Sequence, residues 1–117
     1  MDGGGIFSVG DTFATIWQRA GTLFLARPGT PEIPLGPGTQ PVAATLGPDT
    51  HIFFQRGPDL LATRLTASLA PTTPAPHAKN ARFAVLLALP GDRGGLLAYE
   101  QGPAKGAVSV VVETLAP

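Results

Sequence analysis

Glycine and proline interrupt this chain so often that a long helix is disfavoured throughout. The 117 residues include 15 Gly and 13 Pro, so one of the two falls on average at about every fourth position. Both residues destabilise helix interiors, and both are common in the tight turns that join short strands. The apolar runs between them are four to ten residues long. This pattern predicts an all-β fold.

The length of the chain predicts one domain. A chain of 117 residues lies inside the usual single-domain range, and it can bury roughly two thirds of its unfolded surface without disulfides. We therefore expect a single β domain over residues 1–117, built as an antiparallel β-sandwich or small barrel of about nine short strands. The expected strands are 6–9, 12–19, 22–27, 42–46, 51–56, 60–69, 82–89, 95–101 and 107–115.

The segment 60–69 can be interpreted in two ways. Leu61, Leu65 and Leu69 recur at helical spacing, whereas Thr63 and Thr66 fit the alternation of a strand. The neighbouring segments are strands, and this favours a strand here. A helix remains the alternative.

Three segments are expected to lie outside regular structure. Residues 1–5 contain three consecutive glycines and predict a flexible N-terminal arm, while 28–41 and 70–80 are rich in proline and predict two long loops. The prolines of the first loop fall at 28, 31, 34, 37 and 41. This near-threefold spacing favours a polyproline II arm that binds a partner, and an ordinary exposed loop is the alternative.

Residues that carry chemistry are scarce. The chain has no Cys, which excludes disulfides and thiolate metal ligands, and its serines lie in no Gly-x-Ser-x-Gly turn. Asp49 and His51 would share one face of a strand and could form half of a metal site, but no third ligand is nearby and Asp49 is more simply interpreted as a turn residue. His77 lies among prolines and is expected to be solvated. We therefore expect no catalytic residue, no cofactor and no metal.

Other polar and aromatic residues also have simple structural interpretations. Glu100 and Glu113 are expected to be either solvated or paired with Arg82 or Lys105 across strands. The glycine-rich stretch 91–95 is expected to be a hairpin turn. Trp17 and Tyr99 are candidates for a carbohydrate platform, although a core position is the more common one for Trp. Adjacent Phe53 and Phe54 must point to opposite faces of a strand, so one is expected in the core and the other against a loop, a partner or water.

The charge pattern excludes some partners. Eight basic and eight acidic side chains are scattered singly and give zero net charge, so no basic patch predicts a direct nucleic-acid partner. No apolar run approaches the roughly 18 residues of a membrane helix, and the N-terminus lacks the basic and apolar regions of a signal peptide. We expect no membrane partner and a protein that is soluble when made. Charged residues are only 14% of the chain, which indicates either surface covered by another chain or the codon bias of a GC-rich genome.

Several expected strands are apolar on both faces, as in 23–25, 85–87 and 110–112. In a small sandwich the outer face should be polar, so these strands predict a surface that another subunit covers, with at least about 800 Å² buried per partner. The candidate interface residues are Leu23, Phe24, Leu25, Pro31, Pro34, Pro37, Val110, Val111 and Val112.

Taken together, these features favour a scaffold over a catalyst. We expect a non-enzymatic structural subunit that forms a homo-oligomer and joins a larger protein lattice, with no small-molecule substrate. The composition is similar to that of bacteriophage virion components, namely capsid decoration (cement) or head-tail proteins, so the expected location is the virion, with the cytoplasm as the alternative. A ligand-binding β-sandwich such as a carbohydrate-binding module is the second interpretation, and a small β-barrel enzyme is the third.

Overall fold

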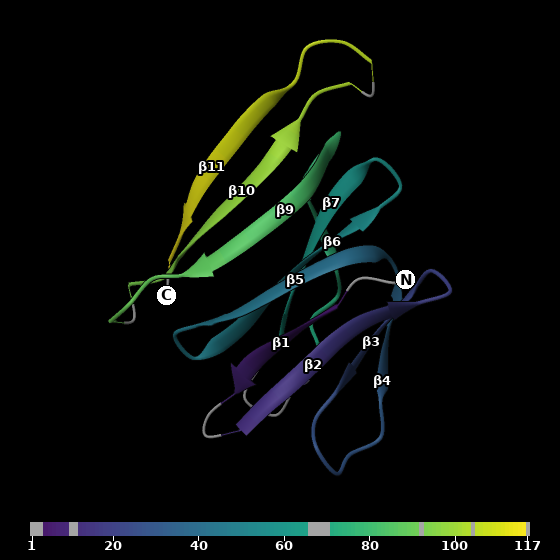
Figure 1. Ribbon diagram of the computed structural model, residues 1–117, viewed down its shortest axis with the longest axis vertical. Helices are drawn as coiled ribbons and strands as arrows, with labels where there is room; N and C mark the ends of the chain where they lie inside the picture. Colours follow the sequence, from purple (N-terminus) through teal and green to yellow (C-terminus); the bar gives the residue numbers. More distant parts are fainter. Residues whose placement is uncertain (1–3, 10–11, 66–70, 92, 104, 117) are drawn as a thin grey trace.

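The computed structural model describes residues 4–9, 12–65, 71–91, 93–103 and 105–116 (Figure 1). These residues form strands, turns and irregular segments without a helix. The strands are β1 (Gly4–Val9), β2 (Thr12–Arg19), β3 (Thr22–Ala26), β4 (Ile33–Pro37), β5 (Thr39–Leu46), β6 (Asp49–Arg56), β7 (Asp59–Leu65), β8 (Ala75–Ala78), β9 (Ala81–Ala88), β10 (Gly95–Gln101) and β11 (Ser109–Leu115). The expected all-β class is confirmed.

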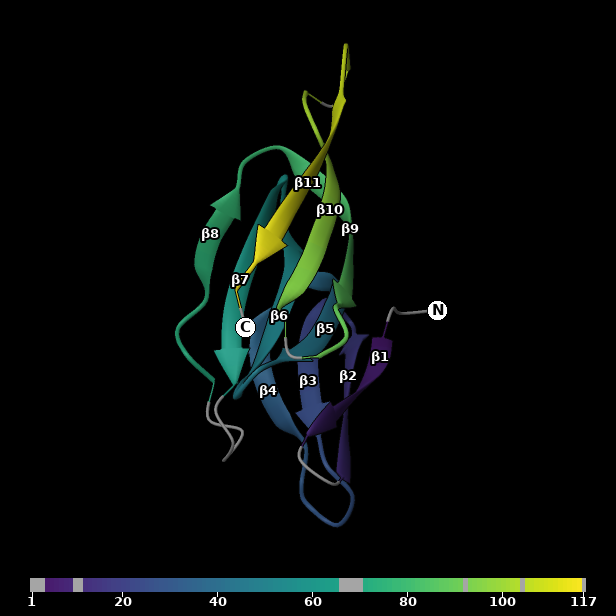
Figure 2. The same ribbon diagram turned by 90° about the vertical axis from the view of Figure 1, so that its left-hand side faces the viewer.

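The strands form three antiparallel sheets. Sheet A has the order β1-β2-β3-β4, sheet B the order β5-β6-β7-β8, and sheet C the order β11-β10-β9. Sheets A and C lie towards opposite ends of the long axis, with sheet B between them (Figures 1 and 2). The Thr45 hydroxyl of β5 donates a hydrogen bond to the Ser8 carbonyl of β1 and so links sheets A and B. The arrangement is consistent with a β-sandwich.

Sheet B is apolar on both faces because it is packed on both sides. Phe54 lies in a core between sheets A and B, together with Ile16 and Leu25, and we call this the A–B core. Phe53 lies in the B–C core with Leu97 and Tyr99 of sheet C. The expectation that one of the two phenylalanines would leave the core is therefore wrong: each ring enters a different core.

The two proline-rich segments are not loops throughout, which corrects the expectation for 28–41 and 70–80. The first contains β4 and the start of β5, and the second contains β8. Both β4 and β8 are edge strands, where proline is tolerated because one side of the strand needs no ladder hydrogen bond. Pro34, for example, pairs in register with Phe24 of β3. These two strands raise the expected nine to eleven among the described residues.

Two residues of the expected N-terminal arm belong to a strand instead. Gly4 and Gly5 belong to β1 and pair with Trp17 and Ile16, whereas residues 1–3 lie outside the described residues. A Cβ atom on Gly4 would lie 2.9 Å from the Ile16 carbonyl oxygen. Glycine is therefore needed at position 4 for close approach of the two strands, rather than for flexibility.

The ambiguous segment is a strand over the part that is described. β7 covers Asp59–Leu65, and residues 66–69 of the expected strand lie outside the described residues. Leu61 and Leu65 face the A–B core, whereas Leu60 faces the B–C core. A strand with two buried faces carries leucines at spacings that imitate a helix, and this explains the ambiguity.

Candidate protein interface on sheet C

The segment Leu23, Phe24 and Leu25 offers no open apolar surface. Leu23 and Leu25 are fully buried in the A–B core, so their side chains do not reach the outside of the chain. Phe24 points the other way, but it stacks on Trp17 with ring centroids 6.0 Å apart, and the Arg19 guanidinium lies 4.2 Å above its ring. The chain itself therefore supplies most of the cover for this segment.

The prolines among the candidates lie at the exposed edge of sheet A. Pro34 and Pro37 belong to β4, and Pro31 lies in the connection between β3 and β4. The Pro37 carbonyl accepts two hydrogen bonds from the Arg56 guanidinium, at 3.0 and 3.1 Å. Pro31 lines a small pocket of about 290 Å³ with residues of β3 and the start of β4. This edge is held to the molecule and is not a free polyproline arm.

The valines of β11 are divided between two faces. Val111 points inward and packs against the B–C core. Val110 and Val112 point outward and remain 77% and 63% exposed. Two of the three candidates on this strand are therefore uncovered in the isolated chain.

These two valines belong to a larger apolar surface, which we call the outer C face. Its members are outward side chains of β9, β10 and β11, namely Phe83, Val85, Leu87, Leu96, Ala98, Val110 and Val112. The register places Val85, Ala98 and Val112 in one row across the three strands. Leu87 and Leu96 lie in the next row, and the rows enclose a shallow apolar hollow of about 240 Å³.

The β9 members of this face were not among the candidates, although the apolar run 85–87 had indicated a strand with two apolar faces. Val85 is 63% exposed and Leu87 is 59% exposed, while Leu86 between them packs inward. The alternation was thus visible in the sequence. The sequence did not show which of the two faces of β9 is exposed to solvent.

Phe83, a member of the outer C face, has a strained backbone conformation. Its φ angle is 57°, in the left-handed region that a bulky residue rarely adopts, and it lies at the bulge where the register between β9 and β10 shifts. The bulge leaves the ring largely exposed. Backbone strain of this kind persists where surrounding structure enforces it, and it gathers at functional sites.

Charged side chains beside the outer C face are already paired. Arg82 Nε donates a hydrogen bond to Glu100 Oε1 at 3.1 Å, and Arg82 also donates to the Gly102 carbonyl at 3.0 Å. The expected Arg82–Glu100 pair is confirmed. Covering the adjacent face would therefore not isolate either charge from its partner.

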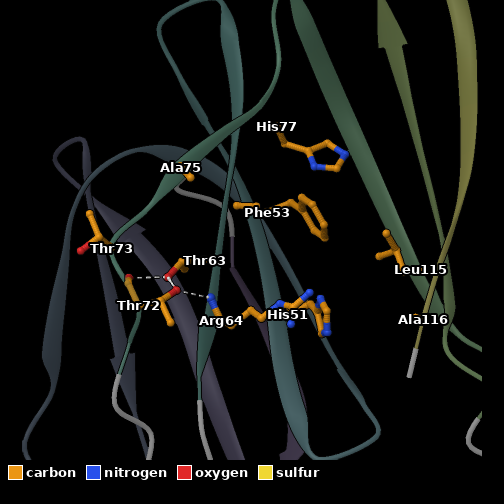
Figure 3. Close-up of a pocket in the computed structure, with 11 residues that line it drawn as sticks. His51, Phe53, Thr63, Arg64, Thr72, Thr73, Ala75, His77, Leu115 and Ala116 are labelled. Atoms are coloured by element: carbon orange, nitrogen blue, oxygen red, sulfur yellow. Dashed lines mark hydrogen bonds between the residues drawn. The ribbon is translucent and has the colours of Figure 1, made fainter.

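A second feature is a pocket of about 300 Å³ between sheets B and C, which we call the B–C pocket (Figure 3). β6 supplies His51 and Phe53, β7 supplies Arg64, β8 supplies His77, and β11 ends in Leu115 beside it. The two histidines of the chain therefore lie in one pocket, which the sequence did not indicate because 26 positions separate them.

His77 belongs to a half-buried cluster in which it contacts other side chains of the chain, so the expectation of a solvated surface histidine is wrong. Its Nε2 lies 2.7 Å from Glu113 Oε2, and its ring makes edge contacts with Phe53 and Tyr99. Glu113 thus pairs with His77, and neither Arg82 nor Lys105 is its partner. Burial raises the pKa of Tyr99 to about 12, aided by a hydrogen bond between its hydroxyl and Glu113.

The same hydrogen bonds stabilise the Glu113 carboxylate. Burial on its own raises the pKa of Glu113, but the hydrogen bonds from His77 and Tyr99 outweigh it, and the net effect is a pKa below the ordinary value. The cluster connects β8 of sheet B to β10 and β11 of sheet C.

His51 has a different environment on the opposite side of the pocket. Burial lowers the pKa of His51, the neighbouring Arg64 guanidinium lowers it further, and Asp49 partly opposes this. The imidazole is therefore neutral near pH 7. Within the described ranges, no three His, Cys, Asp or Glu side chains lie close enough to hold a metal ion together.

The two aromatic residues considered for a carbohydrate platform do not share a surface. Tyr99 is buried in the B–C core, and Trp17 stacks on Phe24 in sheet A.

The part of the chain that is described contains no helix able to cross a membrane. Comparison of the chain with known protein families, curated proteins and solved structures finds no match.

Proposed function

We propose that this chain is a non-enzymatic structural subunit that self-associates through the outer C face. The observation that carries the proposal is the exposure of Val85 and Leu87 on β9 and of Val110 and Val112 on β11, which are between 59% and 77% exposed on the two strands that flank β10. Contiguous apolar surface of this kind is rare on a monomer and is typical of the centre of an interface.

The chemistry of the face favours a second copy of the chain as the first occupant. A face that is apolar across its rows matches itself in a two-fold contact, because no charge needs a complementary partner. Arg82 and Glu100 are already paired beside it. The net charge of zero adds no repulsion between copies.

The wider assignment is a virion component of a bacteriophage, either a capsid decoration (cement) protein or a head-tail protein, in which the oligomer adds to a larger protein lattice. Its support is the composition, with few charges and few groups able to do chemistry. Mass spectrometry of phage particles that carry the gene tests it. Stoichiometric recovery of the chain is expected, and its absence from the particles would refute the virion assignment.

A double substitution tests self-association directly. Val85→Glu with Leu87→Glu places two charges on the outer C face and should convert a dimer of about 24 kDa into a folded monomer of 12.0 kDa in sedimentation equilibrium. Ile6→Glu is the matched control, because Ile6 is 73% exposed but lies in sheet A, and it should leave the dimer intact. A monomeric wild type at about 100 μM, roughly the concentration at which weak specific dimers assemble, would contradict the proposal.

The B–C pocket favours a second candidate function, a ligand-binding β-sandwich. Its volume of about 300 Å³ lies at the lower end of small-molecule sites, and Arg64 and His51 provide polar groups beside the Phe53 ring. Tyr99 and Trp17 lie apart, which disfavours a flat carbohydrate platform.

A further inference from the structure

The outer edge of β11 carries backbone groups without a partner strand. β11 is the terminal strand of sheet C and pairs only with β10 among the described residues. Its position at the outside of the sheet is visible in Figure 1. The amides and carbonyls that face away from β10 are therefore available for a further strand.

Three other edge strands, β1, β4 and β8, have protective features that β11 lacks. The edge strands β4 and β8 contain Pro34 and Pro76, which remove donors from those edges, and β1 is covered in part by Thr45 of β5. β11 has the sequence SVVVETL, without Pro, Lys or Arg. Its one charged side chain, Glu113, points inward to His77.

The B–C core is partly open to solvent on the inward side of β11. The inward residues Leu97 and Tyr99 of β10 are 0% and 6% exposed, whereas the inward residues Val111, Glu113 and Leu115 of β11 are only half-buried. The B–C pocket occupies this side, between β8 and the end of β11 (Figure 3). Its 300 Å³ equals the liquid volume of roughly ten waters, which is space for several side chains.

The pocket lining indicates the chemistry of an occupant. Phe53, Ala62 and Leu115 provide an apolar wall, and Arg64 pairs in register with His51 beside them. Within the described ranges, Arg64 forms no ion pair with a carboxylate. A carboxylate on the occupant would supply that partner.

We propose that an extended, carboxylate-bearing segment of a neighbouring protein pairs with β11 and places its inward side chains in the B–C pocket. This deepens the proposed function, because it supplies the contact by which the subunit joins other members of an assembly. Backbone hydrogen bonds to β11 give affinity, and the pocket selects alternate side chains of the added strand.

A tethered strand tests the proposal on the full chain. The sequence Thr-Asp-Thr-Val-Thr-Val-Thr is joined after the last residue through a flexible linker of about ten Gly and Ser residues, which gives an effective concentration near millimolar. A tail that folds back along β11 passes Leu115 and Arg64 first, so the Asp is placed near the start of the tail. Exchange of the β11 amides that face away from β10 should slow by about tenfold or more.

Variant tails separate the contribution of backbone pairing from that of the carboxylate. Replacing the central Thr of the tail by Pro removes a donor and should abolish the protection. Replacing its Asp by Lys should weaken protection, and Arg64→Glu should restore it with the Lys tail. Unchanged exchange with the parent tail, or equal protection by the Pro tail, would overturn the proposal. A competition result would also overturn the proposal. If millimolar benzoate shifts the His51 and Arg64 resonances and abolishes the protection that the tail gives, the pocket binds small carboxylic acids instead.

All tails are measured in the Val85→Glu, Leu87→Glu background. These substitutions lie on β9 and leave β11 unchanged. Failure of the strand-pairing proposal is then distinct from failure of self-association, because each is read in a separate experiment.

Discussion

At the scale of single residues, the adjacent pair Phe53 and Phe54 defines the layering of the molecule. Both rings are buried, with exposures of 3% and 0%, although they point in opposite directions. Two neighbouring aromatic residues on one strand can both be buried only when a sheet is covered on both faces. The sequence predicted the opposite directions. It did not predict the second cover, because that depends on where the distant strands β9 and β10 pack.

We predict that Phe53→Ala and Phe54→Ala each lower the free energy of unfolding by about 3–5 kcal/mol, because each leaves a cavity in a separate core. Urea denaturation at fixed protein concentration measures both. The control Ile6→Ala removes an exposed side chain and should cost less than about 1 kcal/mol. A small effect at either phenylalanine would show that only one core is tightly packed.

The cluster of His77, Glu113 and Tyr99 predicts a dependence of stability on pH. The folded state holds the pKa of Glu113 below its ordinary value, so folding favours the carboxylate. The stability that it contributes is complete above the pKa of the unfolded chain, about 4.3, and is lost as the pH falls through the lower pKa of the folded state.

Glu113→Gln should therefore lower stability at pH 6 and have a smaller effect near pH 3, the acid side of the ordinary glutamate range. Thermal unfolding of both proteins across this range measures the difference. A difference that stays constant down to the acid limit would show that the carboxylate is not responsible.

At the scale of elements, the hairpins followed from local turn chemistry, whereas the edge strands did not. The strands 12–19, 82–89 and 95–101 were expected within one residue of their observed bounds, because Gly and Asp mark their turns. β4 and β8 were missed because proline normally argues against a strand. That rule holds for central strands, and only the sheet order reveals that these two are edges.

The segment 28–41 therefore has a structural role in addition to any role at the surface. Replacing it by a linker of four Gly and Ser residues would delete β4, the start of β5 and the buried Pro41, and would remove Leu35 from the A–B core. We predict a loss of at least about 2 kcal/mol of stability or failure to fold. Circular dichroism melting measures this. A shortened chain that melts like the wild type would mean that the segment is a connector after all.

At the scale of the whole molecule, the three layers leave a row of apolar side chains uncovered on sheet C, and on sheet A they leave Ile6 and Phe13 exposed. On the outside of sheet A, Trp17 and Arg19 cover Phe24. On the outside of sheet C, the apolar rows of β9, β10 and β11 remain open to solvent. The sequence indicated that some strands had two apolar faces, including 110–112. Packing decided which side chains were buried within the chain, and Leu23 and Leu25 were buried while Val110 and Val112 were not.

The central claim is that the outer C faces of two copies meet. Isotope-filtered NMR on a mixture of labelled and unlabelled chains measures it directly, because intermolecular contacts between methyl groups appear only across the interface. We predict such contacts among the methyl groups of Val85, Leu87, Leu96 and Val112, which lie in adjacent rows of this face. Absence of intermolecular contacts at these methyl groups, or contacts confined to sheet A, would contradict the claim.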